Sequence, residues 1–121
     1  MFLAETNRLR RLLHLSFIGQ TNTSELESGV VEVQALLNDL APGFVLLTDL
    51  SRLEEMDVAC GTHIGRIMDL CRQRGVGRII RVVPKPGRDI GLNILSIFHY
   101  GPSLHAVVCE NMLQAEAYFP P

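Results

Sequence analysis

The stretch that decides the fold is Phe44–Leu47, with the sequence FVLL, an unbroken apolar run that follows the turn residues Pro42 and Gly43. Short apolar runs that begin at a turn are typical of strands buried on both faces. A strand of this kind lies inside a sheet whose two faces are covered by helices. The run therefore predicts the central strand of a layered α/β domain.

A helical pattern lies on each side of this strand in the sequence. Before it, Ser24 and Glu27 match a capping box, and an apolar stripe follows at intervals of three and four until Pro42 and Gly43. After it come an acidic loop and a second apolar stripe, which ends at Gly75. The first stripe contains Leu26, Val30, Val33, Leu37 and Leu40, and the second contains Cys60, Ile64, Ile67, Met68 and Cys71. The spacing predicts two helices.

Shorter segments complete the order of elements. We expect a hairpin from Phe2–Ala4 and Leu12–Ile18, strands at Ile79–Val83 and Leu104–Cys109, and helices at Ile90–Ile97 and Asn111–Tyr118. Strands that alternate with helices run parallel and are joined by right-handed crossovers. The expected fold is one α/β domain over residues 1–121, with a mixed, mostly parallel sheet of about five strands and about four helices.

Composition is typical of a soluble globular domain. The chain has 121 residues, of which 47% are hydrophobic and 20% charged, and a formal net charge of -2. A domain of this size buries about two-thirds of its unfolded surface, which is enough for a core without disulfides. No apolar stretch reaches the roughly 18 to 20 residues of a membrane span, and the first residues lack a signal sequence. We expect no membrane insertion and, because the net charge is small, no nucleic-acid partner.

The cysteines indicate a reducing compartment. Cys60, Cys71 and Cys109 cannot all pair within one chain, and each lies in an apolar segment. A thiol in such a segment packs as a small hydrophobic side chain. Since unpaired thiols are usual in reducing compartments, we expect a cytoplasmic protein.

The stretch from Phe44 to Asp57 (FVLLTDLSRLEEMD), the glycine and helix that follow, and the order of elements resemble the STAS domain. Further similarities are Gly75 before a strand, the step from Val83 to Pro84, and the last helix with QAEA at 114–117. The STAS family includes the bacterial anti-sigma-factor antagonists. The resemblance implies a non-enzymatic, regulatory, cytoplasmic module. Its expected protein partner is a kinase-like anti-sigma factor or a transporter component, and a homodimer stays open.

The site of regulation differs from that of the family. In those antagonists an aspartate is followed by a serine that becomes phosphorylated, at the start of the second helix. Here Asp57 is followed by VACG at 58–61, which contains no hydroxyl. A phosphate would add about 1.5 to 2 negative charges at the helix start, and this chain lacks the usual acceptor for it. Thr62 is the nearest hydroxyl and would substitute only within the first helical turn; otherwise it caps the helix or faces solvent.

The resemblance implies that the partner binds to the loop after Asp57 and to the helix behind it. Asp57 also has a structural explanation, because a carboxylate at a helix N-terminus stabilises the helix by roughly 0.3 to 1 kcal/mol. Arginine side chains form planar, bidentate contacts at interfaces, and Arg88 is expected to flank the surface. The candidate partner-binding residues are Asp57, Val58, Ala59, Cys60, Thr62, His63, Arg66 and Arg88.

Two other functions are consistent with the sequence. A Cys60-dependent enzyme would use a thiol whose pKa is lowered at the helix start, with His63 as its base. A packed thiol beside a boundary histidine gives the same pattern. Alternatively, a small apolar or acyl ligand would bind between the sheet and Ile90–Ile97, where Gly91 permits close approach.

No motif indicates a cofactor, a metal or a nucleotide. Cys60 and Cys71 on one helix would lie about 16 Å apart, too far to share a zinc ion. The glycines between positions 75 and 87 lack the pattern of a phosphate-binding loop. Glu54 and Glu55 are expected to be solvated charges in a polar loop, because no third acid stands at a defined distance from them.

Charge is unevenly distributed along the chain. Residues 19–57 contain eight acids and one base, Arg52, whereas residues 66–88 contain seven bases and one acid, Asp69. This distribution predicts an electrically two-sided molecule that would steer a complementary partner. The alternative is that these side chains only solvate the outside of a helix and a sheet edge.

Overall fold

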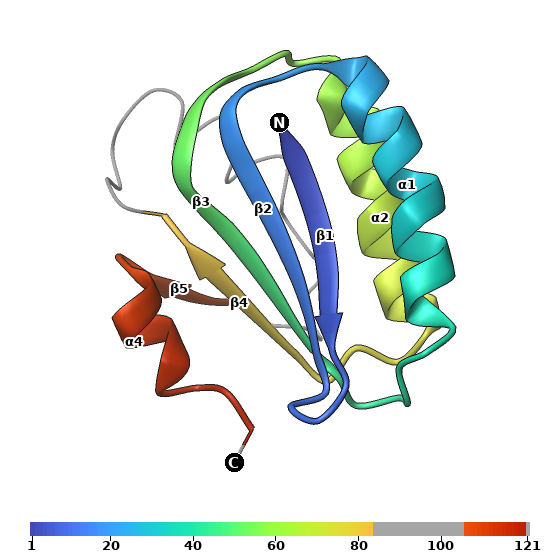
Figure 1. Cartoon of the computed structure of the whole chain (residues 1–121), viewed down its shortest axis with the longest axis vertical. Helices are drawn as coiled ribbons and strands as arrows, with labels where there is room; N and C mark the ends of the chain where they lie inside the picture. The colour runs from blue at the N-terminus through green and yellow to red at the C-terminus, as the bar shows by residue number, and fades with distance from the viewer. Residues whose placement is uncertain (84–105, 121) are drawn as a thin grey trace.

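The computed structural model describes residues 1–83 and 106–120, and its strands form a single five-stranded sheet (Figure 1). The strands lie side by side in chain order. Strand β1 is antiparallel to β2, and every other neighbouring pair is parallel. The strands are β1 (Phe2–Asn7), β2 (Leu12–Thr21), β3 (Val45–Met56), β4 (Arg78–Val82) and β5 (Ala106–Cys109). The predicted α/β class, with its mixed and mostly parallel sheet, is confirmed.

Helices cover both faces of the sheet (Figure 1). Helices α1 (Thr23–Leu37) and α2 (Cys60–Gln73) connect the parallel strands and lie together on one face. Helix α4 (Met112–Glu116) lies on the other face, against β4 and β5. The predicted helix Ile90–Ile97 and the candidate residue Arg88 fall outside the described residues. None of the helices in the described part is both long and apolar enough to cross a membrane.

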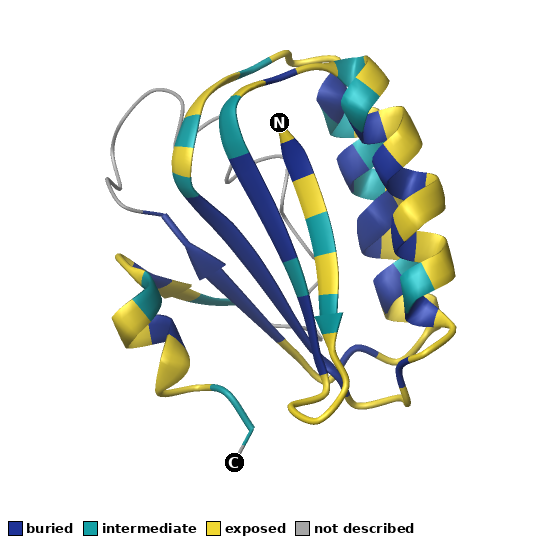
Figure 2. Cartoon of the chain, in the orientation of Figure 1, coloured by how far each residue is buried: buried dark blue, intermediate teal, exposed yellow. Residues whose placement is uncertain are grey.

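Each face of the sheet has its own hydrophobic core. The larger core packs side chains such as Leu15 and Leu46 against the apolar stripes of α1 and α2. The smaller core packs Leu47, Ile80 and neighbouring side chains against Ala115 of α4. Figure 2 shows that β2, β4 and the first half of β3 are mostly buried, as strands covered on both faces must be. From Ser51 on, the residues of β3 are half-buried or exposed.

The ends of several elements differ from the sequence expectation. Strand β3 continues to Met56, so Glu54 and Glu55 lie on a strand and not in a loop. The reason is pairing: β3 follows β2 through irregular register shifts as far as Thr21 opposite Met56. The cap of α1 is Asn22, whose side chain accepts from the backbone N–H of Glu25 at 2.9 Å, and not Ser24. Helix α1 also ends at Leu37, before the predicted Leu40, which is nevertheless buried.

Two loops contact each other where β3 and β4 begin. The backbone N–H of Gly43 donates to the carbonyl of Gly75 (2.7 Å), and the N–H of Gly77 donates to the carbonyl of Phe44 (2.8 Å). A Cβ atom on Gly77 would lie only 2.9 Å from the carbonyl oxygen of Gly43. Glycine at position 77 therefore lets the loops approach and holds Val45 opposite Arg78 in the sheet.

Candidate functional site

The segment between β3 and α2 is shaped by the backbone and side chain of Asp57. Its N–H donates to the carbonyl of Thr21 (3.4 Å), and its carbonyl accepts from the N–H of Cys60 (2.9 Å). Its carboxylate accepts from the N–H of Ala59 at 3.0 Å. Ala59, which precedes the helix, contributes no side-chain cap of its own. Asp57 therefore has the structural role at the helix start that the sequence offers as an alternative to partner contact.

The first part of α2 and the loop before it present a continuous accessible surface. Asp57, Ala59, Thr62 and Arg66 are exposed, His63 is half-buried, and Val58 is 79% exposed. We call these six residues, Asp57, Val58, Ala59, Thr62, His63 and Arg66, the α2 ledge. An apolar side chain as exposed as Val58 gains free energy when a partner covers it. The structure thus brings six of the eight candidate residues onto one surface.

Cys60 does not belong to this surface. Its side chain is fully buried, and its thiol contacts the carbonyl oxygen of Thr21 at 3.8 Å. Burial first, and then the nearby carboxylate of Asp57, raise the pKa of the Cys60 thiol above its ordinary value. A buried thiol with a raised pKa is protonated at neutral pH, which is the opposite of an activated nucleophile. The geometry therefore removes the support for the Cys60–His63 enzyme.

Thr62 lies in the first turn of α2. It is the third residue of a helix that begins at Cys60, and it is exposed. Backbone N–H groups of the first turn lack partners within the helix and favour negative charge. Thr62 therefore lies in the first helical turn, which is the condition for it to replace the missing serine. The residue directly after Asp57 is nevertheless an apolar valine.

A hollow of about 440 Å³ lies beside the ledge, at the carboxyl ends of β2 and β3. Asp57 and Val58 line it from the ledge, and Gln20, Thr21, Asn22, Glu55 and Met56 line the rest. Sequence reasoning did not assign these last five residues to the site. The available signal was topological, because parallel strands end at the same edge of a sheet and residues 20–22 lie at the end of one such strand.

Charge is separated along the strands of the sheet. Glu25, Glu54, Glu55 and Asp57 gather at the end where β2 and β3 finish. Arginines gather at the opposite end, including three in the β1–β2 turn that the sequence analysis did not count. Arg81, one of the seven bases between residues 66 and 88, is buried on β4. In residues 1–83 and 106–120 the charge is two-sided along the strands, and the arginines at the basic end differ in part from those between residues 66 and 88.

The described residues offer no grouped ligands for a metal. Among residues 1–83 and 106–120, no three His, Cys, Asp or Glu side chains lie close enough to hold an ion. The proposed apolar-ligand site beside Ile90–Ile97 lies outside these residues, as does Arg88. The α2 ledge and its hollow are thus the candidate site that the described structure supports.

Comparison with solved structures finds the same fold in SpoIIAA. The anti-sigma factor antagonist SpoIIAA in its unphosphorylated form is 18% identical, with a TM-score of 0.62 over 97% of this chain and 96% of that one. The phosphorylated form of SpoIIAA, a Bacillus cell fate determinant, is 16% identical, with a TM-score of 0.57 over 96% and 99% of the two chains. An uncharacterised protein of the DUF3478 family from Shewanella loihica, with a SpoIIAA-like fold, is 13% identical, with a TM-score of 0.64 over 98% of this chain and 91% of that one.

The TM-scores and the coverage establish a shared fold. No protein-family model and no curated protein matches the sequence. The resemblance to the antagonists that the residues indicate is therefore confirmed for the fold, over nearly the whole chain.

Proposed function

We propose that this chain is a non-enzymatic regulatory module that binds a protein partner through the α2 ledge. The observation that carries the proposal is the fold of the anti-sigma factor antagonist SpoIIAA over 97% of the chain. The exposure of the ledge supports it, because a docking surface must be accessible before the partner arrives. By analogy of fold, the partner is a kinase-like anti-sigma factor or a transporter component.

The ledge has the composition of a small protein interface. Val58 supplies an exposed apolar side chain, and Asp57, Thr62 and Arg66 add exposed polar and charged groups to the same segment. Interfaces between proteins combine an apolar centre with a polar rim in this way. The neighbouring acidic end, with Glu54 and Glu55, favours a partner whose facing surface is basic.

The proposed binding does not depend on a phosphorylated serine. SpoIIAA is known in unphosphorylated and phosphorylated forms. In this chain the four residues after Asp57 carry no hydroxyl, so no phosphate can form there. Unless Thr62 is phosphorylated in place of the missing serine, negative charge at the start of α2 does not rise and fall, and the partner stays bound under conditions that release a phosphorylated antagonist.

The test uses one charge introduced at two exposed valines. Val58→Asp replaces the exposed apolar side chain of the ledge by a carboxylate. Val31→Asp makes the same replacement on α1, where Val31 is 68% exposed. Each variant serves as bait in a lysate of the producing cells, and captured proteins are quantified by mass spectrometry. We expect a protein captured by the wild type and by Val31→Asp to be at least about tenfold depleted with Val58→Asp, the loss of one interface centre.

Binding of the recovered partner is then repeated with purified proteins. Equal affinity of the wild type and Val58→Asp would show that the partner binds elsewhere and would overturn the proposal. If the partner is a kinase, it is incubated with ATP and the chain. We expect no phosphate on the wild type. If the wild type does incorporate phosphate and Thr62→Ala does not, Thr62 is the acceptor, and the proposal that binding is constitutive is refuted.

A further inference from the structure

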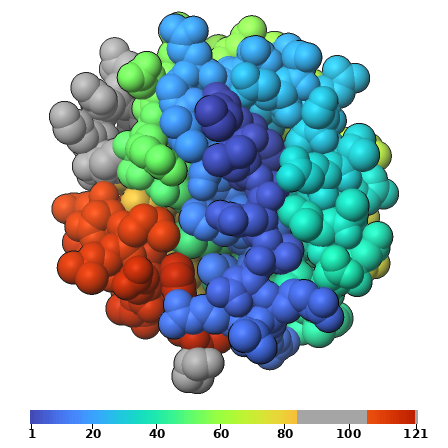
Figure 3. Space-filling model, in the orientation of Figure 1, coloured from blue at the N-terminus to red at the C-terminus, as the bar shows by residue number. Residues whose placement is uncertain are grey.

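The end of the molecule opposite the α2 ledge is rich in arginine. It comprises the β1–β2 turn, the loop before β3, the last turn of α2 with the start of β4, and the residues after α4 (Figure 1). These segments carry six exposed arginines and two acids, Asp39 and Asp69, and a third acid, Glu116, ends α4 beside them. Figure 3 shows blue residues of the N-terminal hairpin next to red residues of the C-terminal part of the chain at this end. The six arginines, which we call the arginine end, are Arg8, Arg10, Arg11, Arg72, Arg74 and Arg78. The surplus of positive charge attracts anions.

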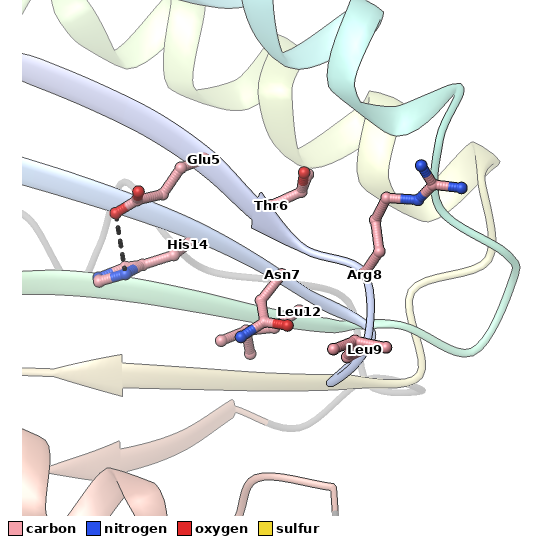
Figure 4. Close-up of a pocket in the computed structure, with 7 residues that line it drawn as sticks. All are labelled: Glu5, Thr6, Asn7, Arg8, Leu9, Leu12 and His14. Carbon is pink, nitrogen blue, oxygen red and sulfur yellow. Dashed lines mark ion pairs between the residues drawn. The ribbon is translucent and has the colours of Figure 1, made fainter.

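An exposed leucine also lies at this end. Leu9, at the tip of the β1–β2 turn, is 97% exposed, the highest value among the exposed large hydrophobic residues of the described chain. Figure 4 shows Leu9 and Arg8 at this turn, beside a hollow of about 520 Å³. Arg8 and Arg10 flank Leu9 in sequence, and Figure 4 shows the Arg8 side chain directed toward the helices, away from Leu9.

The turn is held in place by hydrogen bonds. The N–H of Arg10 donates to the side-chain oxygen of Asn7 (3.1 Å), and the N–H of Arg11 donates to the carbonyl of Arg8 (3.2 Å). The guanidinium of Arg11 donates to the carbonyl of Pro42 at 2.6 Å. These bonds fix the turn against the loop before β3, so Leu9 projects from a defined turn.

Aromatic residues lie at the same end. The guanidinium of Arg10 stacks over the ring of Phe119, 5.5 Å from its centre, and Arg78 donates to the carbonyl of Tyr118 at 3.1 Å. Tyr118 is 42% exposed. Tyrosine is enriched where apolar and aqueous phases meet, because its ring is apolar and its hydroxyl is polar.

We propose that the arginine end docks the protein on an anionic lipid surface, with Leu9 inserted among the acyl chains. An apolar tip gains free energy on leaving water, and arginines near a negatively charged leaflet add an electrostatic term. Arginine stems pack against apolar surface while their guanidinium groups stay at the headgroups. A nucleic acid would bind the arginines, but it offers no apolar environment into which the exposed Leu9 side chain could be transferred from water.

This inference differs from one sequence expectation, that of no membrane insertion, and leaves the proposed function unchanged. The expectation of no membrane insertion rests on the absence of a long apolar segment, which excludes a span but not a single inserted side chain. Because the ledge lies at the other end of the sheet, a protein docked through Leu9 presents the ledge away from the membrane. Partner binding by the ledge and lipid binding by the arginine end can therefore be tested independently.

The experiment is co-sedimentation with vesicles of phosphatidylcholine, with and without phosphatidylserine. We expect the chain to bind only vesicles that contain phosphatidylserine, and binding to fall as salt rises. Leu9→Asp and the double variant Arg8→Glu with Arg10→Glu should each lower the apparent affinity at least about tenfold. Val31→Asp, which replaces another exposed apolar side chain by a carboxylate, and Arg52→Glu, which reverses one exposed charge, both lie outside the arginine end and should bind like the wild type.

Three results would overturn the inference. The first is binding to pure phosphatidylcholine as strong as to the mixed vesicles. The second is unchanged vesicle binding by Leu9→Asp while its melting temperature equals that of the wild type. The third is a complex with duplex DNA, or a dimer of the chain in vesicle-free solution, that Leu9→Asp and the double variant weaken in place of vesicle binding.

Discussion

At the scale of single residues, Cys60 shows how one spacing supports two chemistries. A cysteine at a helix start with a histidine three positions later fits both an activated thiolate and a packed thiol. The structure decides between them through a contact from a distant strand, because the thiol is buried against the carbonyl oxygen of Thr21. Sequence spacing within one helix contains no information about that contact, so the choice could not be made from the residues alone.

The buried thiols also predict how stability depends on pH. Burial raises the pKa of the Cys71 thiol from 9.0 to about 12, whereas in the unfolded chain it keeps its ordinary value. Above about pH 9 the unfolded chain loses this proton and the folded chain keeps it, so the free energy of unfolding falls as pH rises toward 12. Cys71 alone should contribute a slope of about 1.4 kcal/mol per pH unit.

Urea unfolding at several pH values checks this expectation. Cys71→Ala should be less stable at pH 7 because packing is lost, yet its stability should fall less steeply with pH in the alkaline range. The wild type supplies the reference slope, since both proteins share all other titrating groups. Parallel curves for the two proteins between pH 9 and 11 would contradict the buried position of Cys71.

At the scale of elements, two glycines should respond to alanine with opposite signs. Gly77→Ala places a Cβ 2.9 Å from the carbonyl oxygen of Gly43, and neither backbone can yield without disturbing the start of β3 and β4. We expect a loss of about 1 to 3 kcal/mol in the free energy of unfolding. Gly65→Ala, inside α2 with no atom within 4 Å of the new Cβ, should gain about 0.5 to 1 kcal/mol.

Chemical denaturation of the two variants measures both changes. The wild type is the common reference, and a matched slope of free energy against denaturant shows that only stability has changed. A gain in stability for Gly77→Ala would mean that the loops can move apart freely. A loss of more than about 1 kcal/mol for Gly65→Ala would mean that this part of α2 is crowded.

Elements with a strong periodicity were predictable, and their ends were not. The stripes of α1 and α2 and the apolar run of β3 specify type and approximate place, because each must bury one stripe or both faces. The second half of β3 escaped prediction because its charged residues, Glu54 and Glu55, resemble a loop, while pairing with β2 makes them part of a strand. Likewise Asn22, and not Ser24, caps α1, a choice set by where β2 ends.

The candidate site was predictable in part for the same reason. The ledge residues all lie between positions 57 and 66, so a family resemblance at Asp57 was enough to find them. The rest of the hollow comes from the end of β2, which is distant in sequence and becomes adjacent only through the parallel pairing of β2 with β3. Leu9 was likewise an ordinary turn residue until the fold left its side chain uncovered.

At the scale of the whole molecule, one sheet joins two hydrophobic cores and two oppositely charged ends. Adjacent residues of β3 belong to different cores: Leu46 packs with α1 and α2, and Leu47 packs with α4. Both side chains are almost completely buried. Because the same strands form the wall of both cores, we propose that the chain folds as one cooperative domain.

Alanine at each of these two positions tests this cooperativity. Leu46→Ala and Leu47→Ala should each lower the free energy of unfolding by about 2 to 5 kcal/mol, because each removes buried methyl groups and leaves a cavity. In both variants the calorimetric enthalpy should equal the van't Hoff enthalpy, and circular dichroism should follow the same single transition. If Leu47→Ala instead produced an early transition that exposed the α4 side while the α1 and α2 side stayed folded, the two cores would be separate units. Hydrogen exchange would locate such a unit, because amides of β5 would then lose protection before those of β2.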